Sequence, residues 1–337
     1  MKKYIIILFI LSFIFFISFF YLNLEYKNEN LNYPIKFFIK RGENYHTILS
    51  NLKQAGLIKN IYVFKIYNKL FPCAKYIKSG HYLINEPLPA IDILKMFIIG
   101  KIKLEKLTIP EGYNLRQIAK VLAEKFNIEY DSILNVLSSK DFAKKITNNK
   151  YQNLEGLLFP DTYKFDKDID FKDLIKVMYN NFVKKTDPIW SKRHPHYRLS
   201  FYQTLILASI IQKETSDEKE YKIVSSVYHN RLSKGMRLQA CPTVQYLLDK
   251  PKRLTNKELS IKSDYNTYLH KGLPPTPICS PGIDAFVAAI FPDSTDYLYF
   301  LADINGKHYF SKTFKEHNRM KQIIKRKLRN AKRRTNK

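Results

Sequence analysis

Glu214 is the residue of this sequence whose surroundings best suit acid–base chemistry. It ends a helix predicted over 202–214, seven residues after Leu207 and four after Ile210, so its carboxyl group falls on the apolar face of that helix. Partial burial raises the pKa of a carboxylic acid, as a proton donor requires near neutral pH. The same pattern also fits a glutamate that ends a helix and pairs with a neighbouring lysine.

The residues after Glu214 predict a break and then a second helix. Thr215 and Glu218 have the Thr-x-x-Glu spacing of a capping box, which satisfies free backbone N–H groups at a helix start. Apolar residues follow at helical spacing, namely Ile223, Val224, Val227, Tyr228 and Leu232. The candidate acid is therefore expected between two packed helices. In this pattern Tyr228 fits core packing at least as well as contact with a ligand.

The rest of the chain predicts two strand–glycine–helix patterns followed by helices. The first comprises a strand at 35–40, a turn at 41–42, helices at 45–56 and 60–70, a turn and strand at 78–84, and a helix at 90–99. The second begins at 106–112, continues with a helix from Leu115, and leads to helices at 130–148 and 171–186. The string 151–163 between these helices has no helical period, so we expect loop or short strand there.

The first apolar segment, residues 4–22, has no charge, Pro or Gly. About 20 helical residues cross a hydrocarbon core of roughly 30 Å. The segment lacks the short apolar region and small-residue exit of a cleaved signal peptide, which favours an uncleaved anchor. Lys2 and Lys3 favour a cytoplasmic N-terminus, although basic residues also follow the segment. We expect the remaining residues outside the membrane.

The composition is strongly basic, with 57 Lys and Arg against 30 Asp and Glu and a formal net charge of +27. Such charge attracts nucleic acid and anionic surfaces. The sequence, however, has no zinc-finger spacing, RNP1-like string or Gly-rich phosphate loop. Lys, Ile, Asn, Phe and Tyr are abundant together, as an AT-rich coding sequence would produce. We therefore predict no nucleic-acid partner.

The three cysteines, Cys73, Cys241 and Cys279, have no CxxC or His-rich surroundings. The sequence accordingly predicts no metal site, and we expect no cofactor. Cys241 and Cys279 suit a disulfide in an oxidising compartment, but spacing alone leaves that pairing open.

Several strings of the sequence together resemble one family, the endolytic murein transglycosylases of the YceG-like or MltG family. They are IPEGYNLRQIA at 109–119, LEGLLFPDTY at 154–163, LASIIQKET at 207–215, NRLSKGMRLQACPTVQY at 230–246, DYNTYLHKGLPPTPICSPG at 264–282 and YLYFLAD at 297–303. With the amino-terminal anchor, the resemblance covers nearly the whole chain in order. Its motifs are long enough to exclude chance similarity.

The resemblance implies that Glu214, in the Lys-Glu-Thr triplet, is the catalytic acid. Many relatives carry a second Glu where this chain has Gln212, which leaves one candidate in the motif. A further departure is the Ala240–Cys241 pair, where relatives often have Thr-Asp or Ser-Asp. The neighbouring motifs suggest residues that hold the saccharide: Asn230, Gln239, Thr243, Tyr246, Tyr265, Asn266, Thr267 and Tyr268. For Tyr246, core packing is an equally good interpretation.

The activity implied is that of a lyase. Glu214 would protonate the oxygen between MurNAc and GlcNAc, and would then take a proton from the C6 hydroxyl that closes on C1 to leave a 1,6-anhydroMurNAc end. Because no water is consumed, one carboxylate suffices, unlike the pair in most glycoside hydrolases. The family's expected role is to terminate glycan elongation. The expected partners are peptidoglycan strands, the inner membrane and peptidoglycan synthases.

The predicted fold class is α+β, with a single transmembrane helix, a small LysM-like α/β module and a larger mixed domain that has a helical, lysozyme-like catalytic core. The predicted parts are a cytoplasmic tip at 1–3, the anchor at 4–23, a linker at 24–34, the module at 35–105, the catalytic domain at 106–320 and a basic tail at 321–337. We expect a single-pass protein of the cell inner membrane whose catalytic domain is periplasmic.

Two other functions remain open at this point. A non-catalytic, membrane-anchored scaffold would keep the fold and bind peptidoglycan without cleaving it. A muramidase would instead use water, with Asp217, Asp249 or Asp264 as the second carboxylate.

Overall fold

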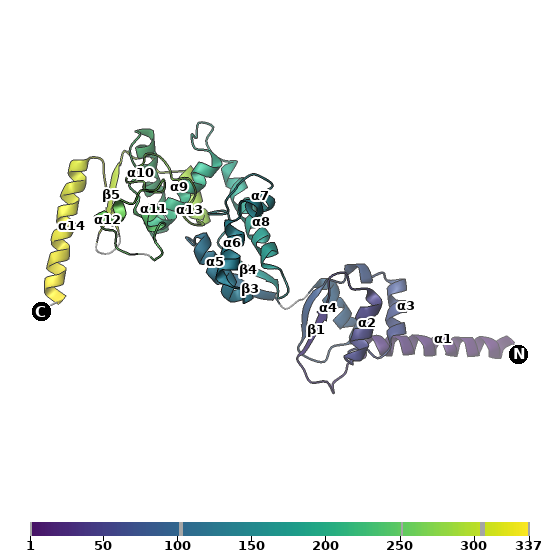
Figure 1. Cartoon of the computed structure of the whole chain (residues 1–337). Helices are drawn as coiled ribbons and strands as arrows, with labels where there is room; N and C mark the ends of the chain where they lie inside the picture. The colour runs from purple at the N-terminus through teal and green to yellow at the C-terminus, as the bar shows by residue number, and fades with distance from the viewer. Residues whose placement is uncertain (1, 101–103, 251, 304–306, 336–337) are drawn as a thin grey trace. The chain divides into compact units, whose positions relative to one another are not determined.

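The computed structural model describes residues 2–100, 104–250, 252–303 and 307–335. Met1 of the predicted tip, residues 101–103 of the predicted module and residues 336–337 of the predicted tail lie outside this part. The fold is mixed α+β, as predicted, and the chain forms two compact units (Figure 1). Unit 1 comprises Met1–Lys106 with Lys164–Ile169, and unit 2 comprises Leu107–Tyr163 with Asp170–Lys337.

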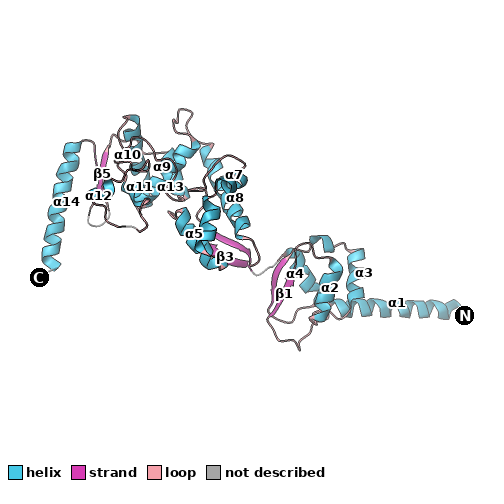
Figure 2. Ribbon diagram, in the orientation of Figure 1, coloured by secondary structure: helices cyan, strands magenta, loops and turns pink. Residues whose placement is uncertain are grey.

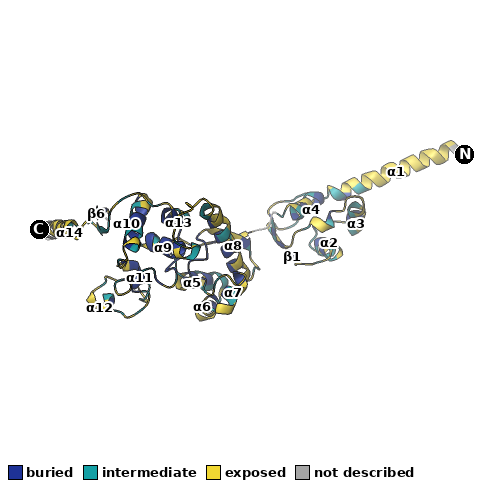
Figure 3. Cartoon of the chain, turned by 90° about the horizontal axis from the view of Figure 1, so that it is seen from above, coloured by how far each residue is buried: buried dark blue, intermediate teal, exposed yellow. Residues whose placement is uncertain are grey.

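Unit 1 begins with helix α1 (Lys2–Leu24), which contains the predicted anchor. Residues 3–24 are long and apolar enough to cross a membrane, and none of the most apolar stretch is buried within the protein (Figure 3). This length and composition suit a membrane span or a signal anchor.

The rest of unit 1 is built on two antiparallel strands, β1 (Ile35–Ile39) and β2 (Gly80–Ile84), with Phe37 opposite Tyr82. The other elements of the unit are α2 (Tyr45–Gln54), α3 (Ile61–Leu70), the short 3₁₀ helix η1 (Ala74–Tyr76) and α4 (Ala90–Ile99) (Figure 2). The side chain of Asn44 caps α2, and Gly100 ends α4 in the left-handed region at φ 80°. Apolar residues from all three α-helices and both strands form one core.

A second two-stranded sheet pairs β3 (Leu104–Thr108) with β4 (Thr162–Asp166). The division between the two units falls within both strands, because unit 1 includes the first residues of β3 and the last residues of β4. Residues 151–163 were expected to form loop or short strand. They form a loop that leads into β4.

Unit 2 opens with the helices α5 (Leu115–Phe126), α6 (Tyr130–Ser138), α7 (Lys140–Ile146) and α8 (Phe171–Trp190). The helical stretch predicted at 130–148 consists of two helices, because the chain breaks at Ser139. The extended backbone of Ser139 ends α6, and its hydroxyl accepts a hydrogen bond from Phe142 N to begin α7. A serine hydroxyl competes with the helix for backbone N–H groups, and here the cap prevails.

The centre of unit 2 is helix α9 (Phe201–Glu214), capped by Ser200 and Gln203. The residues from Thr204 to Ile211 are all buried, so α9 is covered on every side rather than on one face (Figure 3). It packs against α10 (Tyr221–Ser233), α11 (Cys241–Gln245) and α13 (Ile283–Ile290). The last residue of this buried helix is Glu214.

The remaining elements of unit 2 cover this helical core. The short helix α12 (Asn256–Leu259) lies between α11 and α13 in the sequence. Strands β5 (Tyr299–Ala302) and β6 (His308–Ser311) pair antiparallel, and the final helix α14 (Phe314–Thr335) packs on both. Strand β5 also contacts α10, which brings β6 close to the end of α9.

Candidate active site

Glu214 lies where α9 ends and the chain reaches the surface of unit 2. Its carboxyl group is partly buried, and the Tyr228 hydroxyl donates a hydrogen bond of 2.5 Å to Oε1. Within the described part of the chain, Oε2 has no hydrogen-bond partner, and neither Lys213 nor Lys219 pairs with this residue. Glu214 thus keeps one oxygen available for a ligand.

The surroundings of Glu214 place its pKa near neutral pH. Burial raises its pKa to about 7, although the Tyr228 hydrogen bond and the charges of His308 and Arg231 act in the opposite direction. Arg231 is itself buried and donates to Leu298 O at 2.6 Å and Leu238 O at 2.7 Å. At neutral pH a large fraction of Glu214 is therefore protonated, as a general acid requires.

A buried ion pair fixes the segment that follows Glu214. His308 Nδ1 lies 2.6 Å from Glu220 Oε2, the backbone N–H of His308 donates to Glu220 Oε1, and the Thr215 hydroxyl donates to Oε2 at 3.2 Å. Burial acts to raise the pKa of Glu220, but its bonds to His308 outweigh this and lower it. The pair holds β6 against the residue next to Glu214.

The predicted capping box at Thr215 and Glu218 was wrong. Thr215 is the C-cap of α9, and its hydroxyl accepts from Asp217 N and donates to Glu220. The side chain of Asp217 caps the 3₁₀ helix η2 (Glu218–Glu220) instead, by accepting from Lys219 N. The tertiary ion pair of Glu220 thus replaces the local bond that the spacing suggested.

Glu214 opens into a cleft with a volume of about 380 Å³. The cleft is lined by Glu111, Gln212, Lys213, Glu214, Thr215, Ser216, Glu218 and Tyr221. Gln212 accepts a hydrogen bond from Gly282 N and donates one to the Tyr221 hydroxyl. The residue that departs from the family pattern therefore bridges α13 and α10. Glu111, which sequence reasoning did not single out, contributes a second carboxylate to the cleft.

Cys241 and Tyr268 lie on another side of Glu214. The Cys241 sulfur is 3.0 Å from the Tyr268 hydroxyl, and the charge of Glu214 helps to raise the pKa of both groups after burial, which is the larger cause. The sulfur of Cys279 lies close to Ser209 O, and all three cysteines are free thiols. The Cys241–Cys279 disulfide that the sequence left open is not formed.

Four other predicted saccharide-binding residues hold the backbone around the site. Asn230 donates to Thr295 O and Tyr297 O, and buried Asn266 donates to Leu259 O and Ile261 O. Thr243 and Thr267 are buried and share a 2.9 Å hydrogen bond. Their polar groups thus join α10, α11 and the 264–268 segment to neighbouring loops. The exposed Gln239 has φ 48°, and its backbone N–H donates to Thr267 O.

Tyr246 and Tyr265 pack together with ring centroids 5.1 Å apart. The Tyr246 hydroxyl donates to Oε2 of buried Glu155 at 2.8 Å, and the Tyr265 hydroxyl lies 2.7 Å from that of Thr276. Glu155 also accepts from Leu115 N, the first residue of α5. Tyr246 therefore lines a second cavity beside α5 and is not among the residues that line the cleft of Glu214.

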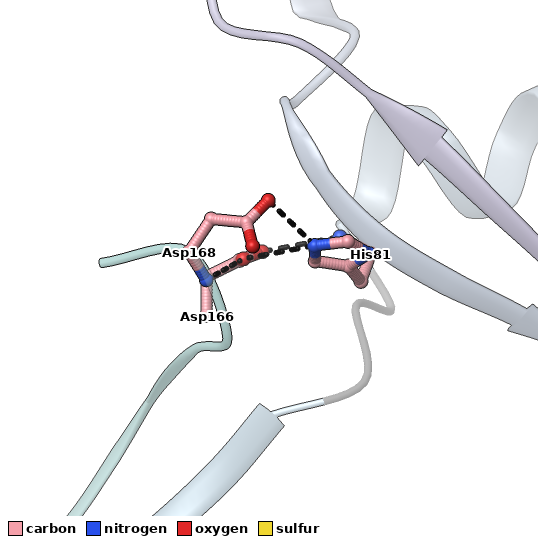
Figure 4. Close-up of side chains that lie close together, drawn as sticks. All are labelled: His81, Asp166 and Asp168. Atoms are coloured by element: carbon pink, nitrogen blue, oxygen red, sulfur yellow. Dashed lines mark hydrogen bonds and ion pairs between the residues drawn. The ribbon is translucent and has the colours of Figure 1, made fainter. Parts of the chain in front are cut away.

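One cluster among the described residues has the composition of a metal site, and it lies in unit 1. His81, Asp166 and Asp168 have ligand atoms within 4.8 Å of one another (Figure 4). His81 Nε2 lies 2.6 Å from Asp168 Oδ2, and the two oxygens of Asp166 accept from His81 N and Asp168 N. These bonds tie β2 to the end of β4 and the residues that follow it.

The comparisons with known proteins agree with the motifs. A family model described as the YceG-like family matches residues 37–323. The chain belongs to the YceG-like family. The resemblance seen in the sequence is thereby confirmed, since this match spans both units.

Relatives within the YceG-like family include named enzymes. The endolytic murein transglycosylase of Bacillus subtilis (strain 168) is 35% identical over 313 residues, which cover 87% of this chain and 84% of that protein. The protein of the same name from Streptococcus pneumoniae (strain D39) is 29% identical over 83% of this chain, which spans 56% of that relative. A 2.6 Å crystal structure of a putative YceG-like protein from Listeria monocytogenes matches with a TM-score of 0.59 and 33% identity, over 85% of this chain and 98% of that chain.

In this YceG-like chain, sequence reasoning singled out Glu214 as the candidate acid but missed most of its neighbours. The spacing of apolar residues predicted a core position for Tyr228. In the structure Tyr228 is buried, and it also bonds to Glu214. Arg231 lay in a quoted motif without an assigned role. His308 reaches the site from β6 and carried no local signal, because only the pairing of β5 with β6 brings it there.

Proposed function

We propose that this protein is an endolytic murein transglycosylase in which Glu214 is the acid and base. One observation carries the proposal: Tyr228 holds one oxygen of Glu214 while the carboxyl group faces an open cleft with its pKa raised to about 7. The names of the relatives from Bacillus subtilis and Streptococcus pneumoniae support the choice of murein as substrate.

In the first step, protonated Glu214 gives its proton to the oxygen that links C1 of MurNAc to GlcNAc. The C1–O bond breaks with both electrons going to that oxygen, and positive charge develops at C1. The N-acetyl group of the same sugar eases this charge, while the cleft positions the ring. The Tyr228 hydroxyl stabilises the carboxylate that forms, because its bond to Oε1 is stronger when Glu214 is charged.

In the second step, the Glu214 carboxylate takes the proton from the C6 hydroxyl of MurNAc. The C6 oxygen attacks C1 and closes the 1,6-anhydro ring, which returns Glu214 to its protonated form. No water is consumed, so a second carboxylate is not needed. A group with a pKa near the working pH can perform both proton transfers.

A hydrolytic reaction is the second candidate, and Glu111 favours it. Its carboxyl group lines the same cleft as Glu214, and burial raises its pKa, with Glu218 and Asp284 adding to the effect. A muramidase would use such a second carboxylate to activate water. Of the acids considered from sequence, Asp217 instead caps η2 and Asp249 lines the second cavity.

We further propose that α1 anchors the protein in the cell inner membrane with its N-terminus in the cytoplasm. The enzyme would then cleave nascent strands as synthases extend them, and so terminate their elongation. The proposal also includes a LysM-like role for the β1–α2–α3–β2–α4 module in holding glycan, and a lysozyme-like role for the α9–α10–α13 core. The exposed apolar surface of α1 supports the anchor, and the buried α9 supports the helical core.

The test is to incubate the full chain, in detergent, with purified peptidoglycan and to identify the new glycan ends by mass spectrometry. We expect 1,6-anhydro ends, one water lighter than hydrolytic ends, and none with Glu214→Gln. Reducing ends would establish the muramidase, and Glu111→Gln would then be the decisive variant. Binding without any new ends would establish a scaffold.

A further inference from the structure

A second cavity in unit 2 adjoins the cleft of Glu214. It has a volume of about 390 Å³ and lies between the first turns of α5 and the segment from α11 to Asp249. Lys213, the residue before Glu214, lines both cavities, and Gly112 of the second cavity directly follows Glu111 of the cleft. The two cavities are therefore neighbours on unit 2, on either side of Lys213.

The charges on its walls are mainly positive, so we call it the cationic pocket. Its lining is Gly112, Asn114, Arg116, Gln117, Lys120, Tyr130, Lys213, Pro242, Gln245, Tyr246, Leu248, Asp249 and Ile278. Arg116, Lys120 and Lys213 thus face one carboxylate, that of Asp249. Within the part of the chain that the structure describes, none of these three cations forms an ion pair.

Two of the cations are held in place by uncharged groups. The Arg116 guanidinium donates to Tyr246 O and lies 5.3 Å from the centroid of the Tyr246 ring. Lys213 Nζ lies 3.5 Å from Gly112 O. The buried carboxylate behind this wall, Glu155, is already bonded to Tyr246 and to Leu115 N. Arg116 also acts electrostatically on Glu155, but burial raises the pKa of that carboxyl group to about 7, so Glu155 offsets only part of the positive charge. The pocket therefore keeps a net positive charge that favours an anionic ligand.

The murein substrate supplies an anionic group at this place. The sugar whose C1 reacts beside Glu214 carries a lactyl group, and nascent strands bear a short peptide with free carboxylates on it. That peptide must leave the cleft close to Glu214. We propose that the cationic pocket binds a carboxylate of the peptide attached to the muramic acid at the cleaved bond, with Arg116 and Lys120 as its main contacts.

This assignment rests on the proposed function and adds a specificity to it. Arg116 offers a fork of N–H donors that matches a carboxylate, and Lys120 adds a mobile positive charge. The amides of Asn114 and Gln117 on the same wall suit the peptide groups that flank the carboxylate. The pocket would thus select strands that still carry peptides over strands that have lost them.

The test compares two substrates with the full chain in detergent: uncrosslinked peptidoglycan strands, and the same strands after an amidase has removed their peptides. The measured quantity is the ratio of kcat/KM for the two. We expect wild type to prefer the peptide-bearing strands, and Arg116→Gln with Lys120→Gln to lower the ratio about tenfold, chiefly through KM. Added salt screens the charges of the pocket, so it should also lower the ratio measured for wild type.

Lys140→Gln is the matched control, because Lys140 is an exposed lysine on α7 outside the pocket lining. Like Lys120→Gln, it removes one positive charge, and it should keep the wild-type ratio of kcat/KM for the two substrates. Lys120→Gln alone guards against misfolding, since Lys120 is exposed and its side chain forms no hydrogen bond or ion pair with the residues that the structure describes. Equal cleavage of both substrates by wild type, or an equal loss on both in the variants, would overturn the pocket assignment. Anhydro ends from peptide-free strands would then still support the proposed function, whereas no cleavage of either substrate would count against that function itself.

Discussion

Glu214 and Glu155 lie in the same unit, and burial raises the pKa of each to about 7. Each also accepts a hydrogen bond from a tyrosine hydroxyl, Tyr228 in one case and Tyr246 in the other. The two glutamates differ in the surroundings of the carboxyl oxygen that does not bond to the tyrosine. Glu155 is 2% exposed and bonds to Leu115 N, whereas Glu214 faces a cleft. A perturbed pKa therefore marks an acid as unusual, but access to a ligand makes it a candidate for catalysis.

The largest expected difference between the two glutamates is in activity. Glu214→Gln cannot give or take a proton, so we expect a loss of about 10³-fold in the rate of strand cleavage. Glu155→Gln keeps an acceptor for Leu115 N and Tyr246 and should lose less than tenfold. Release of soluble glycan fragments measures both variants. A loss of similar size in the two would abolish the distinction between them.

The second difference concerns stability against pH. The carboxyl group of Glu155 has a folded pKa of about 7 and an unfolded value near 4.5, so between these pH values the unfolded chain loses the proton first. Its contribution to the stability of unit 2 is therefore fully present below about pH 4.5 and is lost as the pH rises through about 7.

Glu155→Gln removes this loss, since glutamine does not ionise. Relative to wild type, its free energy of unfolding should rise by up to about 3 kcal/mol between pH 4.5 and 8, from a shift of about 2.5 pKa units. Denaturant unfolding of both proteins at several pH values measures the difference between their free energies of unfolding. A difference that stays constant across this pH range would mean that the pKa of Glu155 is the same in the folded and unfolded chain.

The third prediction uses Tyr228→Phe to sharpen the role of the bond to Glu214. In the proposed mechanism strand cleavage requires protonated Glu214, so kcat/KM in wild type should fall as the pH rises through about 7. The Tyr228 hydroxyl lowers the pKa of Glu214, and its removal should move this alkaline limb to higher pH. A pH–rate profile of each protein measures the position of the alkaline limb. A limb at the same pH in both proteins would mean that a group other than Glu214 produces it.

The smallest expected effect is that of Tyr246→Phe, the matched change at Glu155. It removes one buried hydrogen bond and should lower the free energy of unfolding by about 1 kcal/mol. It should leave the alkaline limb in place, because Tyr246 bonds to Glu155 and not to Glu214. Thermal unfolding and the same pH–rate profile test both points. A shifted limb would show that the two regions are coupled.

Local pattern determined much of the fold. Side chains of Asn44, Asn114 and Ser200 start α2, α5 and α9, and Gly100 ends α4, where the spacing of apolar residues predicted helices. These signals act within one turn of the chain, so they depend little on the rest of the fold. The capping box predicted at Thr215 is the exception, because the buried Glu220–His308 pair replaces it. The break at Ser139 inside the predicted helical stretch 130–148 was also not foreseen.

The sequence by itself singled out Glu214 as the candidate acid, through helical phase and through a motif whose family is confirmed. Only the tertiary structure decided which of two similar glutamates faces a cleft, and it brought Tyr228, Arg231 and His308 around Glu214 from α10 and β6. The physical reason is that proton affinity depends on burial and on charges a few ångströms away, and these neighbours come from segments far apart in the chain.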